Sequence, residues 1–86
     1  MKVLVLSNKK DDILIILNFT PVVRYDWHVK VYGKPGWTEI FNSDSKEFWG
    51  TGDVYNPQIE CTLLDKNSDL YEIKVHLPAL GGIVLH

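Results

Sequence analysis

Cysteine is almost absent from this sequence, and its scarcity excludes several kinds of site. Cys61 is the only cysteine among 86 residues, so no disulfide can form within the chain and no CxxC pair exists for redox chemistry or zinc binding. A chain of this length supports one hydrophobic core. The sequence therefore predicts a single domain over residues 1–86, located in a reducing cytoplasmic compartment.

Clusters of basic residues and long apolar runs are also missing. The formal net charge is −2, and Lys9-Lys10 is the only adjacent basic pair, which is too little positive charge for a nucleic-acid surface. The aliphatic run from Ile13 to Leu17 is far too short to span a membrane. We therefore expect neither nucleic acid nor a membrane as a partner.

No window has the spacing of an amphipathic helix, and the patterning is that of β-strands. Apolar and polar side chains alternate over residues 26–32 and 70–77, and glycine, proline and polar turns interrupt the chain at strand-like intervals. The sequence predicts an all-β fold, an antiparallel Greek-key β-sandwich of about seven to eight short strands with no significant helix. The expected strands cover residues 2–7, 13–19, 26–32, 37–41, 59–63, 70–77 and 83–85.

The second expected strand does not alternate. A strand with one face on the core and one face in water should read apolar-polar-apolar, whereas five apolar residues in succession call for cover on both faces. One face can pack on the opposite sheet, and the other needs a loop or a neighbouring domain. We expect an apolar patch in this run, which consists of Ile13, Leu14, Ile15, Ile16 and Leu17.

Groups that could carry catalysis or hold a metal are not arranged for either task. Glu39 and Asp44 could approach each other, but a small sandwich has no obvious cleft to hold a sugar ring between two carboxylates. The acidic and amide side chains of Asn42, Asp44, Glu47 and Asp53 lack the spacing of a calcium loop. We predict no catalytic residue, no metal site and no cofactor.

Aromatic residues are numerous, and they leave two interpretations open. Trp27 and Trp37 lie on the inward phases of expected strands and are expected in the core. Trp49 and Tyr55 lie in expected loops, where a flat ring could stack on a sugar. Packing in a core or interface is favoured over sugar binding, because each ring buries a large apolar area.

A polar run follows the strand that begins at Trp37. Asn42, Ser43, Asp44 and Ser45 carry side-chain oxygens that hydrogen-bond to nearby backbone groups and so stabilise tight turns. We interpret this run as a strand end and a corner that hold the sandwich together, with Trp37 anchoring the core behind it.

Four short motifs together resemble a known family. They are Asn18-Phe19-Thr20-Pro21, Trp37-x-Glu39-Ile40-x-Asn42-Ser43-Asp44-Ser45, Gly50-Thr51-Gly52 and Leu77-Pro78-Ala79-Leu80. In order and spacing they are similar to the C-terminal β-domain, of the alpha-amylase C-terminal all-beta type, of bacterial 1,4-α-glucan (glycogen) branching enzymes. The resemblance extends from about Ile13 to Leu85.

The resemblance implies a role within a larger enzyme of glycogen biosynthesis. Branching enzymes cut an α-1,4-glucan chain and transfer it to a 6-hydroxyl, using an aspartate nucleophile and a glutamate acid/base in a (β/α)8 barrel. This chain contains no part of such a barrel, so the resemblance implies a non-catalytic sandwich that packs against it. Two alternatives stay open: a free-standing α-glucan-binding module that uses Trp49 and Tyr55, and a β-sandwich interaction domain with no connection to glucan.

Overall fold

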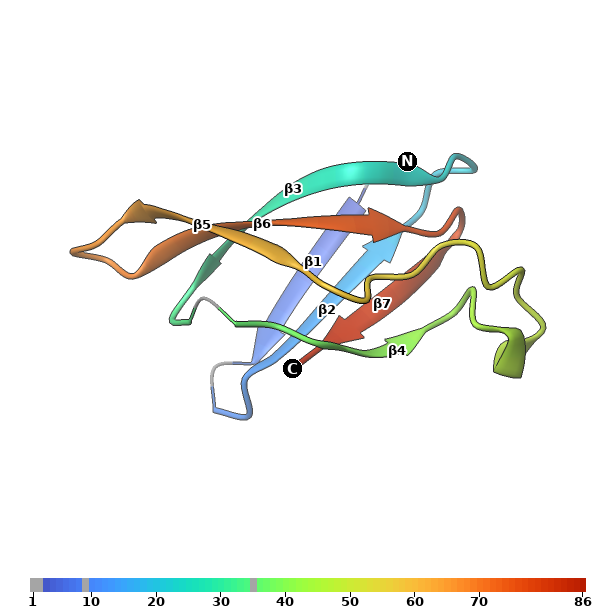
Figure 1. Ribbon diagram of the computed structural model, residues 1–86, viewed down its shortest axis with the longest axis horizontal. Coiled ribbons are helices and arrows are strands. Elements are labelled where there is room, and N and C mark those ends of the chain that lie inside the picture. The colour runs from blue at the N-terminus through green and yellow to red at the C-terminus, as the bar shows by residue number, and fades with distance from the viewer. Residues whose placement is uncertain (1–2, 9, 35) are drawn as a thin grey trace.

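The structure is a computed structural model that describes residues 3–8, 10–34 and 36–86. Its described residues form seven β-strands and one short 3-10 helix, with the strands in two antiparallel sheets. The molecule is elongated, with principal extents of 41 × 23 × 20 Å. The expected antiparallel β-sandwich is confirmed (Figure 1).

The two sheets differ in size. Sheet A has the strand order β1 (Val3–Asn8), β2 (Ile13–Asn18), β7 (Gly81–Leu85), β4 (Glu39–Asn42). Sheet B has the order β3 (Arg24–Tyr32), β6 (Leu70–Leu77), β5 (Glu60–Asp65). The connections after β2, β3, β4 and β6 each cross from one sheet to the other, and β7 returns to lie between β2 and β4 (Figure 1).

The hydrophobic core lies between the inner faces of the sheets. Side chains alternate between the two faces of a strand, so every second residue of β2, β3, β6 and β7 points inward. Each large aliphatic side chain buried in this way stabilises the fold by about 1.5–3 kcal/mol. The buried core residues are Leu14, Ile16, Val29, Val31, Ile73, Val75, Leu77, Ile83 and Leu85.

The two tryptophans expected in the core differ. Trp27 is 36% exposed, so that expectation was wrong. Trp27 lies opposite Val75 of β6 and so keeps the inward phase, but it stands on an edge strand beside a register shift between Arg24 and Trp27 and a left-handed Asp26 with φ 51°, where its ring stays exposed. Trp37 precedes β4 rather than starting it, yet its ring is partly buried against the core.

The inward face of the edge strand β1 is not packed closely against sheet B. Val5 and Ser7 are paired with Ile16 and Leu14 of β2, and residues directly opposite each other share a face of the sheet. Val5 and Ser7 therefore face inward, but Val5 is 39% exposed and Ser7 is also exposed. The space beside them is a pocket of about 350 Å³ that β1 and β3 both line.

The connection between β4 and β5 projects beyond the sheets (Figure 1). It contains the 3-10 helix η1 (Lys46–Phe48), which begins after Ser45, whose side chain accepts a hydrogen bond from the backbone N–H of Glu47. Trp49 ends the helix with a left-handed φ of 68°. This segment carries the polar corner and three loop aromatics, Phe48, Trp49 and Tyr55.

Candidate functional site

The polar corner after β4 is a set of hydrogen bonds between side chains and the backbone. The Asn42 carboxamide donates to the carbonyl of Val54 at 2.8 Å, and its oxygen accepts from the N–H of Asp44 at 2.8 Å. The Ser43 hydroxyl accepts from the N–H of Gly82 at 2.9 Å. The run therefore joins its own turn to a distant loop segment and to strand β7.

Asp44 is the centre of this corner. One carboxylate oxygen accepts from the Thr51 hydroxyl at 2.6 Å and from the N–H of Val54 at 3.1 Å, and the other accepts from the N–H of Thr51 at 3.1 Å. The hydrogen bond from the Thr51 side chain is the main reason that the pKa of Asp44 lies below 3.8, with the backbone donors adding to it against the effect of burial. Asp44 is thus an ionised, fully engaged structural group.

The Asn18–Pro21 motif, at the end of β2, is a second place where side-chain hydrogen bonds join distant parts of the backbone. We call such a place a polar joint. The Asn18 side chain is buried and donates to the carbonyls of Val22 at 2.9 Å and Pro78 at 3.0 Å. Its oxygen accepts from the backbone N–H of Thr20 at 3.0 Å and from the Thr20 hydroxyl at 2.6 Å. Asn18 and Thr20 serve the fold, whereas Phe19 is 47% exposed and Pro21 is also exposed.

A third buried amide, Asn56, was not singled out from the sequence. It exchanges two hydrogen bonds with the backbone of His76, with its amide donating to the carbonyl at 3.0 Å and its oxygen accepting from the N–H at 2.6 Å. Its amide also donates to a carboxylate oxygen of Glu39, which accepts from Asn42 as well. Glu39 therefore accepts hydrogen bonds that hold the corner together, as Asp44 does.

The apolar run in β2 divides between two faces. Leu14 and Ile16 are 1% and 0% exposed and belong to the core, so these two cannot contribute to an external patch. Ile13, Ile15 and Leu17 lie on the opposite face and are half-buried. Although every residue is apolar, the burial of the strand alternates in the ordinary way.

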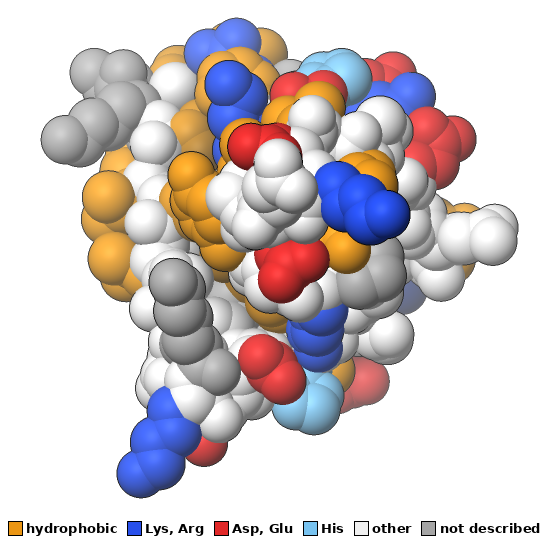
Figure 2. All heavy atoms as spheres, turned by 90° about the vertical axis from the view of Figure 1, so that its left-hand side faces the viewer, with side chains coloured by type: hydrophobic (Ala, Val, Ile, Leu, Met, Phe, Trp, Pro, Cys, Tyr) orange, Lys and Arg blue, Asp and Glu red, His pale blue; other side chains and the backbone are white. Residues whose placement is uncertain are grey.

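Neighbouring strands extend this outer surface with further apolar side chains. Leu4 lies opposite Leu17 and Leu6 opposite Ile15 on β1, while Val84 lies opposite Ile15 on β7 and Phe41 opposite Val84 on β4. The space-filling view shows hydrophobic side chains gathered toward its left-hand side (Figure 2). We name this surface the outer apolar face, and it consists of Leu4, Leu6, Ile13, Ile15, Leu17, Phe41 and Val84.

A groove of about 330 Å³ runs along one end of the outer apolar face. Phe19 and Leu80, which are 47% and 68% exposed, lie on its rim beyond the strands. No charged side chain lines it among the described residues. A groove of this size without charged groups can accept an apolar side chain from another protein surface.

The loop aromatics separate into two groups. The ring of Phe48 packs against Phe41 with their centroids 5.0 Å apart, so Phe48 continues the outer apolar face into the loop. Trp49 is 98% exposed and Tyr55 is 56% exposed. Neither Trp49 nor Tyr55 lines the groove, and their assignment to sugar contact stays a prediction.

Within residues 3–8, 10–34 and 36–86, no group of three or more His, Cys, Asp or Glu side chains is placed to hold a metal ion. Burial raises the pKa of the Cys61 thiol, which makes it a poor nucleophile at neutral pH. No helix among the described residues is long and apolar enough to cross a membrane.

Comparison with known proteins agrees with this architecture. A family model described as the alpha amylase, C-terminal all-beta domain matches residues 3–86. The chain is 42% identical over 80 residues to the 1,4-alpha-glucan branching enzyme GlgB 2 of Clostridium perfringens, which covers 92% of this chain and 12% of that protein.

Two further relatives carry the same name. The 1,4-alpha-glucan branching enzyme GlgB of Aquifex aeolicus is 38% identical over 76 residues, covering 88% of this chain, and that of Francisella tularensis is 35% identical over 79 residues, covering 92%. The chain spans 12% of the length of each of these relatives. The resemblance to the β-domain of branching enzymes is confirmed, and the chain belongs to the family of alpha-amylase C-terminal all-beta domains.

Proposed function

We propose that residues 1–86 form the non-catalytic C-terminal β-sandwich domain of a 1,4-α-glucan branching enzyme, and that the outer apolar face docks this domain on the catalytic barrel. The observation that carries the proposal is the contrast between the outer faces of the two sheets. The lone cysteine and the relatives' enzyme class support a cytoplasmic location.

The outer face of sheet B is polar, as expected of a face in water. His28 contacts Glu72 at 2.9 Å, and Lys74 pairs with Glu60 at 3.1 Å. The outer apolar face of sheet A carries aliphatic and aromatic side chains at the corresponding outward positions. A contiguous apolar surface on a small protein marks an interaction site. Removing such a surface from water favours association by about 25 cal/mol of free energy per Å² of apolar area buried.

The carboxylates support a structural role rather than catalysis. Glu39 accepts hydrogen bonds from two buried amides, and Asp44 accepts three from its own loop. An acid/base catalyst must exchange a proton with substrate, whereas these two groups are engaged in holding the corner.

One observation favours the second candidate, an α-glucan-binding module. Trp49 is 98% exposed, and so large an apolar ring held in solvent offers a surface on which a sugar can stack. Tyr55, 56% exposed, is the second ring proposed for this role.

The docking proposal can be tested with the branching enzyme of C. perfringens from which the matching segment has been removed. The wild-type chain should co-elute with that truncated enzyme and show no branching of amylose by itself. Leu17→Lys places a charge in the outer apolar face and should abolish association, while Thr62→Lys, at an exposed position opposite Glu72 on β5 of sheet B, should not. Equal behaviour of the two variants, failure of the wild type to associate, or branching by the chain alone would overturn the proposal.

A further inference from the structure

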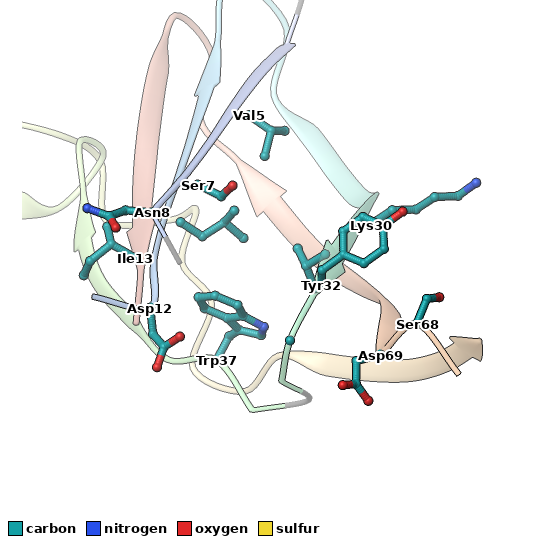
Figure 3. A pocket seen from close by; sticks show the side chains of 13 residues that line it. Val5, Ser7, Asn8, Asp12, Ile13, Lys30, Tyr32, Trp37, Ser68 and Asp69 are labelled. Carbon is teal, nitrogen blue, oxygen red and sulfur yellow. The ribbon is translucent and has the colours of Figure 1, made fainter. Parts of the chain in front are cut away.

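The three tryptophans differ in what their rings contact within the chain. Trp37 lines the pocket between β1 and β3 (Figure 3), and its indole N–H donates to the carbonyl of Lys34 at 3.1 Å. The guanidinium of Arg24 stands 5.8 Å from the ring centroid of Trp27. Trp49 is 98% exposed, and no other described residue forms a hydrogen bond, ring contact or cation–π contact with its indole. Of the three rings, this one has no partner in the part of the chain that the structure describes.

The backbone holds Trp49 in a conformation that bulky residues seldom adopt. Its φ of 68° and ψ of 17° lie in the left-handed region, where the side chain of a non-glycine residue crowds the backbone. Such a conformation persists only where the surrounding structure enforces it. Here the N–H of Trp49 donates to the carbonyl of Lys46 at 3.2 Å, and the N–H of Gly50 donates to the carbonyl of Ser45 at 3.0 Å. The loop therefore fixes a large apolar ring in solvent at a strained position.

Hydrogen bonds on the other side of Trp49 close the loop. The Thr51 hydroxyl and N–H donate to the Asp44 carboxylate at 2.6 and 3.1 Å, and the N–H of Gly52 donates to the Asp44 carbonyl at 2.7 Å. Because both sides of Trp49 are bonded to residues 44–46, its backbone loses little conformational freedom when a partner binds. Trp49 is a projection that is formed before its partner arrives.

The polar groups near Trp49 favour a protein partner over a sugar. A bound sugar needs hydrogen-bonding groups beside the ring on which it stacks, because its hydroxyl groups leave water on binding. Three polar side chains close to Trp49 in the sequence are already engaged within the loop. Asp44 accepts three hydrogen bonds, the Ser45 hydroxyl accepts one from the 3-10 helix at 3.4 Å, and the Thr51 hydroxyl donates to Asp44. A ring that is bare on both faces fits instead an apolar pocket that encloses it.

Trp49 is continuous with the outer apolar face. Phe48, the preceding residue, is 50% exposed, and its ring packs against Phe41 with their centroids 5.0 Å apart. Phe41 lies opposite Val84 and belongs to the outer apolar face. A partner seated on that face therefore borders Phe48 and lies next to Trp49. The nearest partner for Trp49 is the catalytic barrel proposed to cover that face.

We propose that Trp49 anchors the docked domain, with its indole enclosed in an apolar pocket on the catalytic barrel. The pocket should also hold one hydrogen-bond acceptor, because an indole N–H is a donor only and usually finds a partner when it is buried. Tryptophans that fill a pocket on the partner carry a large share of the binding energy of an interface. This inference rests on the proposed docking of the outer apolar face and adds the residue on which much of its affinity depends.

Affinity measurements on the chain and the truncated C. perfringens enzyme test this role. Trp49→Ala should weaken association by about thirtyfold or more, the loss typical of an interface hot spot. Tyr25→Ala removes an aromatic side chain that is 63% exposed on β3 of sheet B, and it should change the dissociation constant by less than about threefold. Because the indole of Trp49 contacts no described residue, Trp49→Ala should keep the urea midpoint of the wild type. Equal affinity of Trp49→Ala and the wild type would overturn the proposal.

Trp49→Phe separates the ring from its N–H. Phenylalanine keeps an aromatic side chain but donates no hydrogen bond, so this variant should bind more weakly than the wild type and more tightly than Trp49→Ala. In ¹H–¹⁵N NMR spectra of the labelled chain, the indole N–H signal of Trp49 should move when the enzyme binds. The signal of Trp37, in the pocket between β1 and β3, should stay in place. A Trp49 signal that is unchanged in the complex would also overturn the proposal.

Other occupants of the ring give different results. A saturable shift of the Trp49 signal when the free chain is titrated with millimolar maltoheptaose would place a sugar on the ring and overturn the proposal. Dimerisation of the chain that Trp49→Ala abolishes would place a second copy there, with the same consequence. Leu17→Lys tests docking independently of Trp49. Loss of association in Leu17→Lys with full affinity in Trp49→Ala would refute the anchor alone, whereas failure of the wild type to associate would refute the proposed function.

Discussion

The Thr51 hydroxyl donates a 2.6 Å hydrogen bond to the carboxylate of Asp44, seven residues earlier in the chain. The backbone N–H of Thr51 reaches the other carboxylate oxygen at 3.1 Å. Gly50, the residue before Thr51, packs directly against the backbone of Asp44. A Cβ at this position would overlap the carbonyl of Asp44, so the close approach requires glycine. The loop that carries the most exposed tryptophan is therefore closed on Asp44.

Replacement of Asp44 by alanine should destabilise the fold by about 1 kcal/mol, since three donors lose their acceptor. The change can be measured as a lower midpoint in urea unfolding. Asp53→Ala, an exposed position in the same loop, is the control and should leave the midpoint nearly unchanged. An Asp44→Ala variant as stable as the wild type would contradict the assigned role of the corner.

The same carboxylate should make stability depend on pH. Because the pKa of Asp44 is lower in the folded chain than its usual 3.8, the ionised form stabilises the fold above that pH, and the stabilisation is lost as the pH falls through the folded value. Urea midpoints from about pH 5 to about pH 2 should therefore fall less steeply for Asp44→Asn than for the wild type. Parallel profiles would show that the carboxylate does not contribute.

Asn56 should be costlier to remove than an exposed asparagine. Its replacement by alanine leaves the backbone N–H and carbonyl of His76 without their partner in a part-buried setting, at a cost of about 1–3 kcal/mol for each unsatisfied group. Asn67→Ala, at an exposed turn position, should change the free energy of unfolding by less than about 0.5 kcal/mol. Equal effects would remove the case for Asn56 as a structural joint.

Gly81 should resist replacement because of Ser43. A Cβ at Gly81 would overlap the Ser43 hydroxyl, which accepts a hydrogen bond from Gly82, so Gly81→Ala should destabilise the fold by about 1–3 kcal/mol. At Gly36 a Cβ would meet nothing within 4 Å, and Gly36→Ala serves as the control. The cost at Gly81 should shrink in a Ser43→Ala background, and an unchanged cost would place its cause elsewhere.

The strand phases could be read from the sequence wherever alternation was regular. On β6, the side chains of Ile73, Val75 and Leu77 point into the core, as the pattern predicted. Trp27 keeps its inward phase opposite Val75 but is not buried, and the pairing of β3 with β6 shifts register next to it. A local pattern carries no information about such a shift.

The polar joints depend on partners far away in the sequence. Asn18 reaches the carbonyl of Pro78, and Asn56 reaches His76, so neither bond could be predicted from neighbouring residues. By contrast, the uninterrupted apolar run of β2 did indicate a second covered face, although only alternate residues of the run lie on it.

The central claim is that the outer apolar face contacts the rest of a branching enzyme. The most direct test is cross-saturation NMR of methyl groups, with the isotope-labelled chain bound to the truncated C. perfringens enzyme. Signals of Ile15, Leu17 and Val84 should lose intensity when the enzyme is irradiated, while those of Leu63 and Leu64 on sheet B should keep theirs. Intensity loss on sheet B with none at Leu17 would contradict the account.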